Sequence, residues 1–222
     1  MRKQLISATA GLLALAAAGF VAEWIDGGAQ AATDPVAEAR APFDTLRLST
    51  ELARLASARN DAWGLVIAAR LRKQTPLEEV ARAPDAGKAE AAEDVAEGWL
   101  DQAERLGGDD PRLAALVAEV RAMRFKGRTG GPQVSKARVG PGATHRYGER
   151  FEIGRPAVVY VEGDGDTDLM LRVLGPGGDT ACADTGPGDV KLCAWTAGRS
   201  GSYAVEVLNR GRVENAYAFA TN

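Results

Sequence analysis

The chain has 222 residues, which is enough for one large domain or two small ones. Its formal net charge is −3 and no block or stripe of Lys and Arg stands out, so nucleic acid is not an expected partner. Because His145 is the single histidine, a His-rich zinc site is excluded.

The N-terminus has the pattern of an export signal. Arg2 and Lys3 precede an apolar run over residues 5–21, and Ala29-Gln30-Ala31 has the small-x-small form of a cleavage site. We predict a signal peptide over residues 1–31 and a periplasmic or secreted protein with no membrane span after signal removal. The alternative is a retained anchor, for which the apolar run is short.

The chain has two cysteines, Cys182 and Cys193, and both follow the predicted cleavage site. In an oxidising compartment a close, even pair is expected to form a disulfide. The alternative is a pair of buried free thiols. A catalytic thiol is not expected, because its usual histidine partner is scarce in this chain.

Residues 34–125 are rich in Ala, Leu, Glu and Arg, which favour helix. Apolar residues recur at helical spacing in successive stretches of this region. The first stretch ends at Asn60-Asp61, where Asp61 is suited to cap the second. A third helix is predicted over Lys88–Leu106 and stops at Gly107-Gly108. Asp110-Pro111 opens a fourth, because Pro fits the first turn of a helix.

We predict that these helices form two pairs in a small helical bundle, with Trp63 and Trp99 in its core. A flexible connection over residues 76–87 would join the pairs. The pairs loosely resemble tetratricopeptide-like helical hairpins, which remain the alternative, although the repeat is too long for that family. Residues 126–143 contain several Gly and Pro residues and are predicted to form a linker.

From residue 144 to residue 222 the apolar pattern has period two, as in half-buried strands. Leu169, Leu171 and Val173, for example, share one face of a predicted strand. Many short strands separated by Gly-rich turns predict a β-sandwich. The expected fold class is therefore α+β in two domains, with an N-terminal helical bundle or hairpins and a C-terminal all-β sandwich.

Asp164, Asp166 and Asp168 occupy every second position of a glycine-containing turn. Ca²⁺ takes about six to eight oxygen ligands, and alternating carboxylates supply several of them. Asp184, from a neighbouring loop, is a further candidate ligand. The alternative is a solvated β-turn whose Asp side chains bond the local backbone. An EF-hand is excluded because no Glu occupies the last ligand position of such a loop.

Trp195, Tyr203 and Tyr217 have two interpretations. They form either an aromatic platform for a sugar or peptide, or part of the core, which their alternation within strands favours. His145 is expected in an exposed loop or at a strand edge. A Ser-His-Asp triad is not expected, because no nucleophile elbow accompanies this histidine.

Several stretches of the β half follow one another in a characteristic order. They are Phe151-Glu152-Ile153, residues 157–161, residues 163–169, Gly177-Gly178, Trp195-Thr196, residues 201–209 and Asn215-Ala216-Tyr217. This order resembles the bacterial pre-peptidase C-terminal domain over residues 144–222. The resemblance implies a jelly-roll-like β-sandwich in a secreted bacterial protein. Some members of the family bind calcium, and some bind extracellular polymers such as collagen.

Two features depart from the family pattern. Met170 stands where a second acid is common, which removes one calcium ligand. In addition, no peptidase domain precedes the module in this chain.

The sequence therefore predicts an exported, non-enzymatic protein with a calcium-stabilised sandwich. Its helical domain would serve protein contact, and its β domain adhesion to a protein or an extracellular polymer. The alternative is an accessory partner, chaperone- or inhibitor-like, of a separately encoded secreted peptidase.

Overall fold

The computed structural model describes residues 34–90, 94–123 and 131–222 of the chain. The predicted signal peptide and its cleavage site lie outside these residues. Within the described ranges, no helix has both the length and the hydropathy of a membrane span. The helical and β halves belong to one unit, residues 34–222, and therefore pack against each other.

Four helices form the N-terminal half of the described chain. They are α1 (Pro35–Ala58), α2 (Ala62–Lys73), α3 (Val95–Gly107) and α4 (Pro111–Ala122). The predicted boundaries at Asp61, Gly108 and Pro111 are confirmed as the N-cap of α2, the C-cap of α3 and the first turn of α4. α3 begins later than the predicted Lys88, because the Asp94 carboxylate caps it by accepting two backbone N–H hydrogen bonds.

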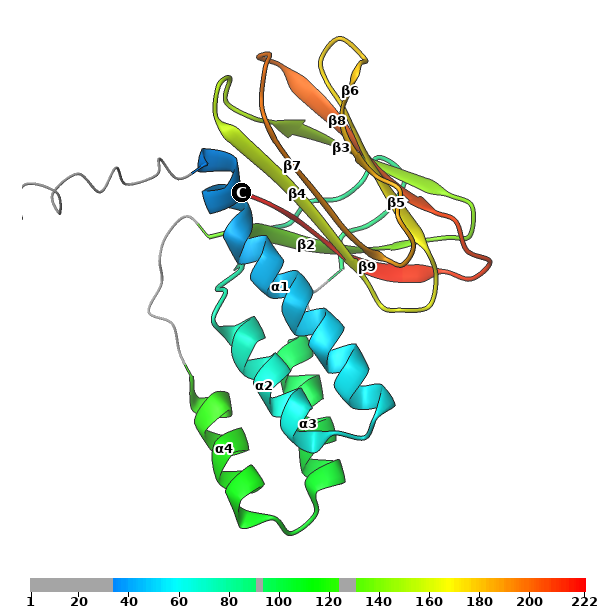
Figure 1. Ribbon diagram of the computed structural model, residues 1–222. Coiled ribbons are helices and arrows are strands. Elements are labelled where there is room, and N and C mark those ends of the chain that lie inside the picture. Colours follow the sequence, from blue (N-terminus) through cyan, green and yellow to red (C-terminus); the bar gives the residue numbers. More distant parts are fainter. Residues whose placement is uncertain (1–33, 91–93, 124–130) are drawn as a thin grey trace, which may run out of the picture. The chain divides into compact units, whose positions relative to one another are not determined.

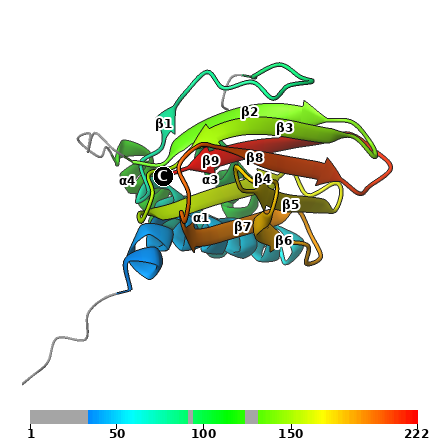
Figure 2. The ribbon, with the colours of Figure 1, turned by 90° about the horizontal axis from the view of Figure 1, so that it is seen from above.

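Two sheets form the β half (Figure 2). The five-stranded sheet has the order β1 (Glu78–Glu79), β2 (Gln133–Val139), β9 (Asn215–Thr221), β4 (Pro156–Gly163) and β7 (Val190–Thr196). The four-stranded sheet has the order β3 (Thr144–Arg150), β8 (Ser202–Asn209), β5 (Leu169–Leu174) and β6 (Thr180–Asp184). Apart from the short parallel pair β1–β2, the neighbouring strands are antiparallel.

The strand pairing is nested. β2 pairs with β9, β3 with β8, β4 with β7, and β5 with β6. A long hairpin folded back in this way and divided between two sheets is a jelly roll. The predicted α+β class, with an all-β jelly-roll-like sandwich after the helices, is therefore confirmed.

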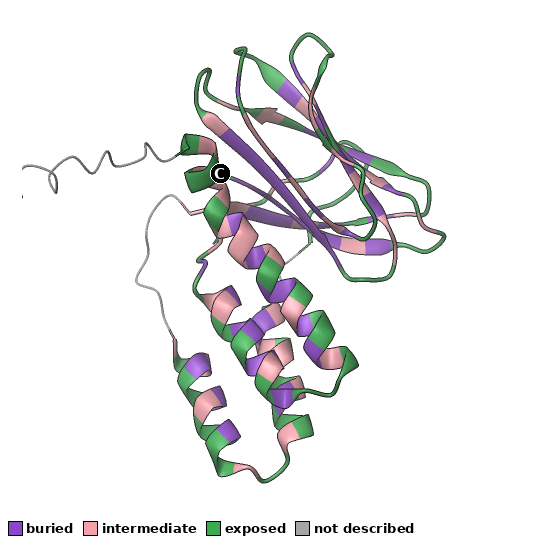
Figure 3. Cartoon of the chain, viewed as in Figure 1, coloured by how far each residue is buried: buried purple, intermediate pink, exposed green. Residues whose placement is uncertain are grey.

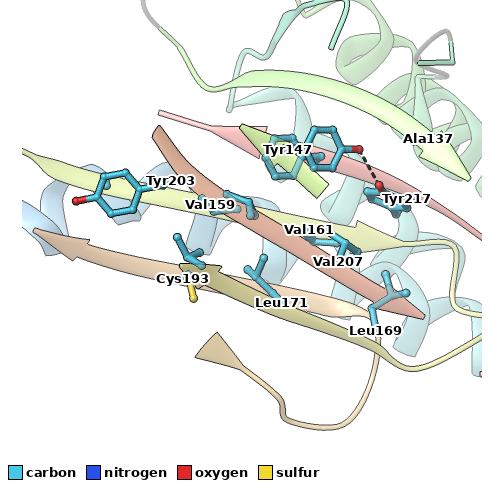
Figure 4. Packing of buried hydrophobic residues seen from close by; sticks show 14 of the residues in the cluster. Ala137, Tyr147, Val159, Val161, Leu169, Leu171, Cys193, Tyr203, Val207 and Tyr217 are labelled. Atoms are coloured by element: carbon cyan, nitrogen blue, oxygen red, sulfur yellow. Dashed lines mark hydrogen bonds between the residues drawn. The ribbon is translucent and has the colours of Figure 1, made fainter. Parts of the chain in front are cut away.

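The space between the two sheets is an apolar core (Figure 4). Leu169, Leu171 and Val173 of β5 point into it and are fully buried, as their alternation predicts. The rings of Tyr147 and Phe219 stack there with their centroids 4.1 Å apart. The period-two apolar pattern of β5 thus predicts correctly which of its residues face the core of the sandwich.

A second core lies on the outer face of the five-stranded sheet, where α1 covers β4 (Figures 1 and 3). Val159 and Val161 of β4 face the other sheet, whereas Val158 and Tyr160 face α1. The ring of Phe43 from α1 lies 6.2 Å from that of Tyr160. Burial on both faces explains why β4 reads as an unbroken apolar run.

The helices have their own core, formed mainly by small and aliphatic residues of α1 to α4. Trp99 packs against it, as predicted. The prediction for Trp63 is wrong, because this side chain is 44% exposed. Leu65, Val66 and Ala69 form the buried face of α2, so Trp63 falls on the opposite face.

The predicted linker, residues 126–143, contains a strand. β2 occupies residues 133–139 and pairs with β9 along its whole length. The prediction was wrong for these residues because Gly131-Pro132 and Gly140-Pro141 flank β2 rather than interrupt it. Val134, Ala137 and Val139 between them are buried.

Residues 76–90, here called the edge strap, run along the open side of the sandwich between β2 and β3. The backbone N–H of Val80 donates to the Val134 carbonyl (2.8 Å), and that of Asp85 to the Arg146 carbonyl (2.9 Å). The strap thus covers edges of both sheets, which blocks pairing with other chains. This is a correction to the predicted flexible connection over residues 76–87.

Arg82 fixes the edge strap to the sandwich. Its guanidinium donates to Gln133 (2.9 Å) and Thr221 (3.3 Å) and pairs with Glu149 at 3.3 Å. It also lies 5.4 Å from the centre of the Phe219 ring. One side chain therefore links the strap to β2, β9 and β3.

Candidate functional site

The predicted calcium ligands lie in the β4–β5 loop and at the last residue of β6, at one end of the sandwich. The Asp164 carboxylate accepts hydrogen bonds from the backbone N–H groups of Asp166 (3.2 Å) and Ala216 (2.8 Å). The Asp184 carboxylate accepts from those of Gly186 (3.2 Å) and Leu192 (3.0 Å). Both carboxylates therefore bond the backbone, as in the alternative interpretation of the acidic turn.

Asp168 faces positive side chains of the protein itself. Its Oδ1 lies 3.6 Å from Nζ of Lys191, and its Oδ2 lies 3.4 Å from Nη1 of Arg210. Lys191 is only 1% exposed. A buried lysine beside Asp168 supplies the positive charge that a cation would otherwise bring.

The acidic turn also keeps unpartnered polar atoms. Asp168 Oδ1, Thr167 Oγ1 and both side-chain polar atoms of Asn215 are buried without a hydrogen bond. Among the described residues, however, Asp, Glu, His and Cys form no group of three or more suited to a metal ion. Asp164, Asp166, Asp168 and Asp184 do not converge on one point, and their calcium role stays a prediction.

The Cys182–Cys193 disulfide is present, with the two Cα atoms 5.9 Å apart. Cys182 lies in β6 and Cys193 in β7, which are edge strands of different sheets. The bond therefore joins the sheets on one side of the sandwich, while the edge strap covers the other side.

A buried ion pair joins the helices to the five-stranded sheet. Nη1 of Arg72, from α2, lies 2.6 Å from Oε2 of Glu162, from β4, and the side chains are 9% and 7% exposed. Tyr160 donates its hydroxyl to the same carboxylate oxygen at 2.7 Å. Burial is the largest single influence and acts to lower the pKa of Arg72. The charge and hydrogen bond of Glu162, with a contribution from Tyr160, together exceed it and raise that pKa.

A second ion pair joins α1 to the loops of the sandwich. Arg54 donates to both carboxylate oxygens of Asp189, at 2.6 and 3.1 Å, and to the Gly163 carbonyl at 2.9 Å. Asp189 is 2% exposed and also accepts from the Gly165 backbone N–H. These two ion pairs and the apolar contacts of α1 fix the position in which the helices pack on the five-stranded sheet.

A cleft of about 670 Å³ lies beside this joint, a volume in the range of ligand sites. Its lining includes Arg72, Lys73, Leu77, Glu97, Lys136 and Asp164. Three further lining residues, Glu90, Asp94 and Met123, adjoin segments 91–93 and 124–130.

His145 lies at the edge strand β3, as predicted, but it is only 4% exposed. Its Nδ1 is 2.8 Å from the Tyr217 hydroxyl, which is 2.7 Å from the Tyr147 hydroxyl (Figure 4 shows the latter bond). Burial lowers the pKa of His145, and a hydrogen bond to the Ala86 backbone opposes that effect. The ring is buried because the edge strap covers it.

Lower pH is expected to destabilise the protein through His145. Its pKa is lower in the folded than in the unfolded chain, so the stability it contributes is complete above about pH 6.5 and falls as the ring protonates. We expect the free energy of unfolding of the wild type to fall more steeply than that of His145→Gln between about pH 7.5 and pH 5. Urea denaturation at both pH values measures the difference, and parallel slopes would contradict it.

The alternative interpretation, an aromatic platform of Trp195, Tyr203 and Tyr217, is not realised. Tyr203 and Tyr217 are each 2% exposed and lie at opposite ends of the core (Figure 4). Trp195 is partly buried and packs with Tyr203 and Phe151. The core interpretation is confirmed for both tyrosines, and Trp195 remains partly accessible.

The solvent-facing sides of α1 and α2 carry large apolar residues, one of which, Trp63, was predicted in the core. Four large side chains are exposed: Leu48 (54%), Leu55 (49%), Trp63 (44%) and Ile67 (44%). Leu48 and Leu55 lie two turns apart on α1, and Trp63 and Ile67 lie one turn apart on α2. We call these four side chains the hairpin face.

The two helices of the hairpin face lie in contact. A Cβ atom added at Gly64 of α2 would lie 2.9 Å from Cβ of Ala56 on α1. Both stripes are on the helix sides away from the buried residues Leu46, Thr50 and Leu65. Neither the length nor the hydropathy of these stripes distinguishes them from core stripes, and this is why the sequence did not reveal the exposed face.

No family model and no curated protein matches the chain. Among solved structures, the periplasmic g-type lysozyme inhibitor PliG of Aeromonas hydrophila is 17% identical, with 41% of this chain and 84% of that chain covered and a TM-score of 0.33. The pre-peptidase C-terminal domain of collagenase from Bacillus anthracis is 10% identical, with 39% and 87% covered and a TM-score of 0.31. A carbohydrate-binding module of Cellvibrio mixtus lichenase 5A is 13% identical, with 42% and 79% covered and a TM-score of 0.28. The family resemblance stays a prediction.

Proposed function

We propose that the chain is an exported, non-enzymatic binding protein that holds a partner protein on the hairpin face. The observation that carries the proposal is the 44–54% exposure of four large apolar side chains on neighbouring helices. We take these four side chains as one patch, and exposed apolar patches often mark interaction sites. Burying them against a partner contributes about 25 cal/mol per Å² of apolar surface.

Export is supported by the N-terminal sequence pattern and by the disulfide, which is typical of oxidising compartments. The proposal that the protein is not an enzyme is supported by the burial of His145. Its imidazole lies under the edge strap and is bonded to Tyr217, so it does not face a substrate. An accessory partner of a secreted peptidase would use the same face and would differ in the identity of the bound protein.

Site-specific photo-cross-linking tests the proposal. A benzophenone side chain at position 67 of the exported protein is expected to give adducts with one protein of the native exported fraction. Position 153 provides the matched control, because Ile153 is an exposed aliphatic residue (62%) of the sandwich rather than of the helices. Its benzophenone variant should give few adducts.

Two results would overturn the proposal. One is equal adduct formation at positions 67 and 153. The other is an adduct between two copies of this chain, which would assign the hairpin face to self-association. A benzophenone side chain at position 63 is expected to give the same adduct as the one at position 67. Leu55→Glu/Ile67→Glu, which changes exposed side chains only, should remove the adduct from position 63 and leave the melting temperature nearly unchanged.

A further inference from the structure

A second pocket, of about 270 Å³, lies at the end of the sandwich where β5 turns into β6 and β7 into β8. It is separate from the hairpin face and from the acidic turn. Its lining includes Pro176, Asp179, Ala181, Trp195, Arg199 and Tyr203. We call it the end pocket.

Trp195 supplies the end pocket with an aromatic wall. Its ring packs edge-on against Phe151, with centroids 5.1 Å apart and planes at 78°, and lies 5.8 Å from Tyr203. Its Nε1 is buried and has no hydrogen-bond partner. An indole N–H is a donor only, and leaving it unpaired costs about 1–3 kcal/mol. Because Nε1 has almost no exposed surface, a ligand in the end pocket would contact the ring rather than the N–H.

The rim of the end pocket carries one positive and one negative side chain. Arg199 Nη1 lies 3.3 Å from Asp179 Oδ1, and the side chains are 65% and 61% exposed. The pair is neutral as a whole, yet it offers both N–H donors and a carboxylate acceptor. A ligand with several hydroxyl groups and no net charge matches this arrangement better than an anion or a cation.

The two loops that form the rim are fixed before any ligand binds. The Tyr203 hydroxyl donates to the Arg199 carbonyl at 3.0 Å. Gly201 has φ +133°, and a Cβ atom there would lie 2.9 Å from Cγ of Pro176 in the opposite loop. A rim of this kind loses little conformational entropy on binding.

We propose that the end pocket binds one pyranose ring of a neutral glycan. The aromatic wall would pack against the C–H face of the sugar, and the Arg199–Asp179 pair would bond vicinal hydroxyls. The site goes beyond the proposed function. A chain with both sites would attach to a glycan through the sandwich while its helices hold a protein.

NMR titration of the exported chain with cellohexaose, chitohexaose and maltohexaose tests this proposal. The indole N–H resonance of Trp195 is assigned by its absence in Trp195→Phe. At least one of the three oligosaccharides should shift this resonance, while the indole resonances of Trp63 and Trp99 stay in place. Trp195→Phe replaces the indole wall with a smaller ring, and Arg199→Gln removes the positive charge of the rim. Each should weaken binding about fivefold or more. Arg212→Gln, at an exposed arginine of the β8–β9 loop, should not.

The proposal is overturned if none of the three oligosaccharides moves the Trp195 resonance, or if both variants bind as tightly as the wild type. A proline-rich peptide that shifts this resonance when the sugars do not would assign the pocket to a polypeptide and also overturn it. Because Arg199 is exposed, its variant is expected to fold even if Trp195→Phe is unstable.

Discussion

Replacing Glu162 with Gln is expected to lower the free energy of unfolding by about 3–5 kcal/mol, because it leaves the Arg72 guanidinium buried without its counter-charge. The pair lies where α2 meets β4, so the loss falls on the joint between the helices and the sheet. Urea denaturation followed by circular dichroism measures it. Glu152→Gln, in an exposed pair with Arg155, should leave stability nearly unchanged.

A double-mutant cycle separates the cost of a stranded charge from the value of the pair. Arg72→Met/Glu162→Leu removes both charges and replaces them with side chains that pack in an apolar site. We expect this double variant to be more stable than either single variant. Additive losses in the cycle would show that the two side chains do not interact, contrary to the 2.6 Å contact.

Removing the disulfide is expected to have the second-largest effect. Cys182→Ala/Cys193→Ala should lower the free energy of unfolding by about 2–4 kcal/mol, because the reduced chain gains conformational freedom when unfolded. The loss arises on the side of the sandwich where no strap joins the sheets. Thermal melting at a fixed scan rate measures it.

A reducing agent supplies the control for this prediction. It should lower the melting temperature of the wild type toward that of the double alanine variant and leave the variant unchanged. A wild type that melts identically with and without reductant would show that the bond adds nothing to stability. The hairpin face would be unaffected in either case, because it lies on the helices.

Local signals in the sequence predicted the helix ends and the inner strand faces well. Asp61 and Pro111 act at helix termini through backbone hydrogen bonding and a fixed φ, which depend on a few neighbouring residues. Leu169 and Leu171 alternate because one side of β5 faces the core. Such features need no knowledge of what packs against the element.

Features that depend on distant partners were missed. The unbroken apolar run of β4 indicated burial on both faces, but nothing in the sequence identified α1 as its cover. β2 was hidden by the turn residues on either side of it. Lys191 and Arg210 approach Asp168 only after folding, so the acidic run alone did not show that the protein supplies its own cations.

The nested pairing of the strands has a consequence for biosynthesis. β2 is among the first strands in sequence to pair, yet its partner along its whole length is β9, and β4 also pairs with β9. The jelly roll therefore cannot close until its final segment has been translated, and contacts between such distant segments form slowly. An unfinished chain therefore keeps the strand edges that await β9 unpaired.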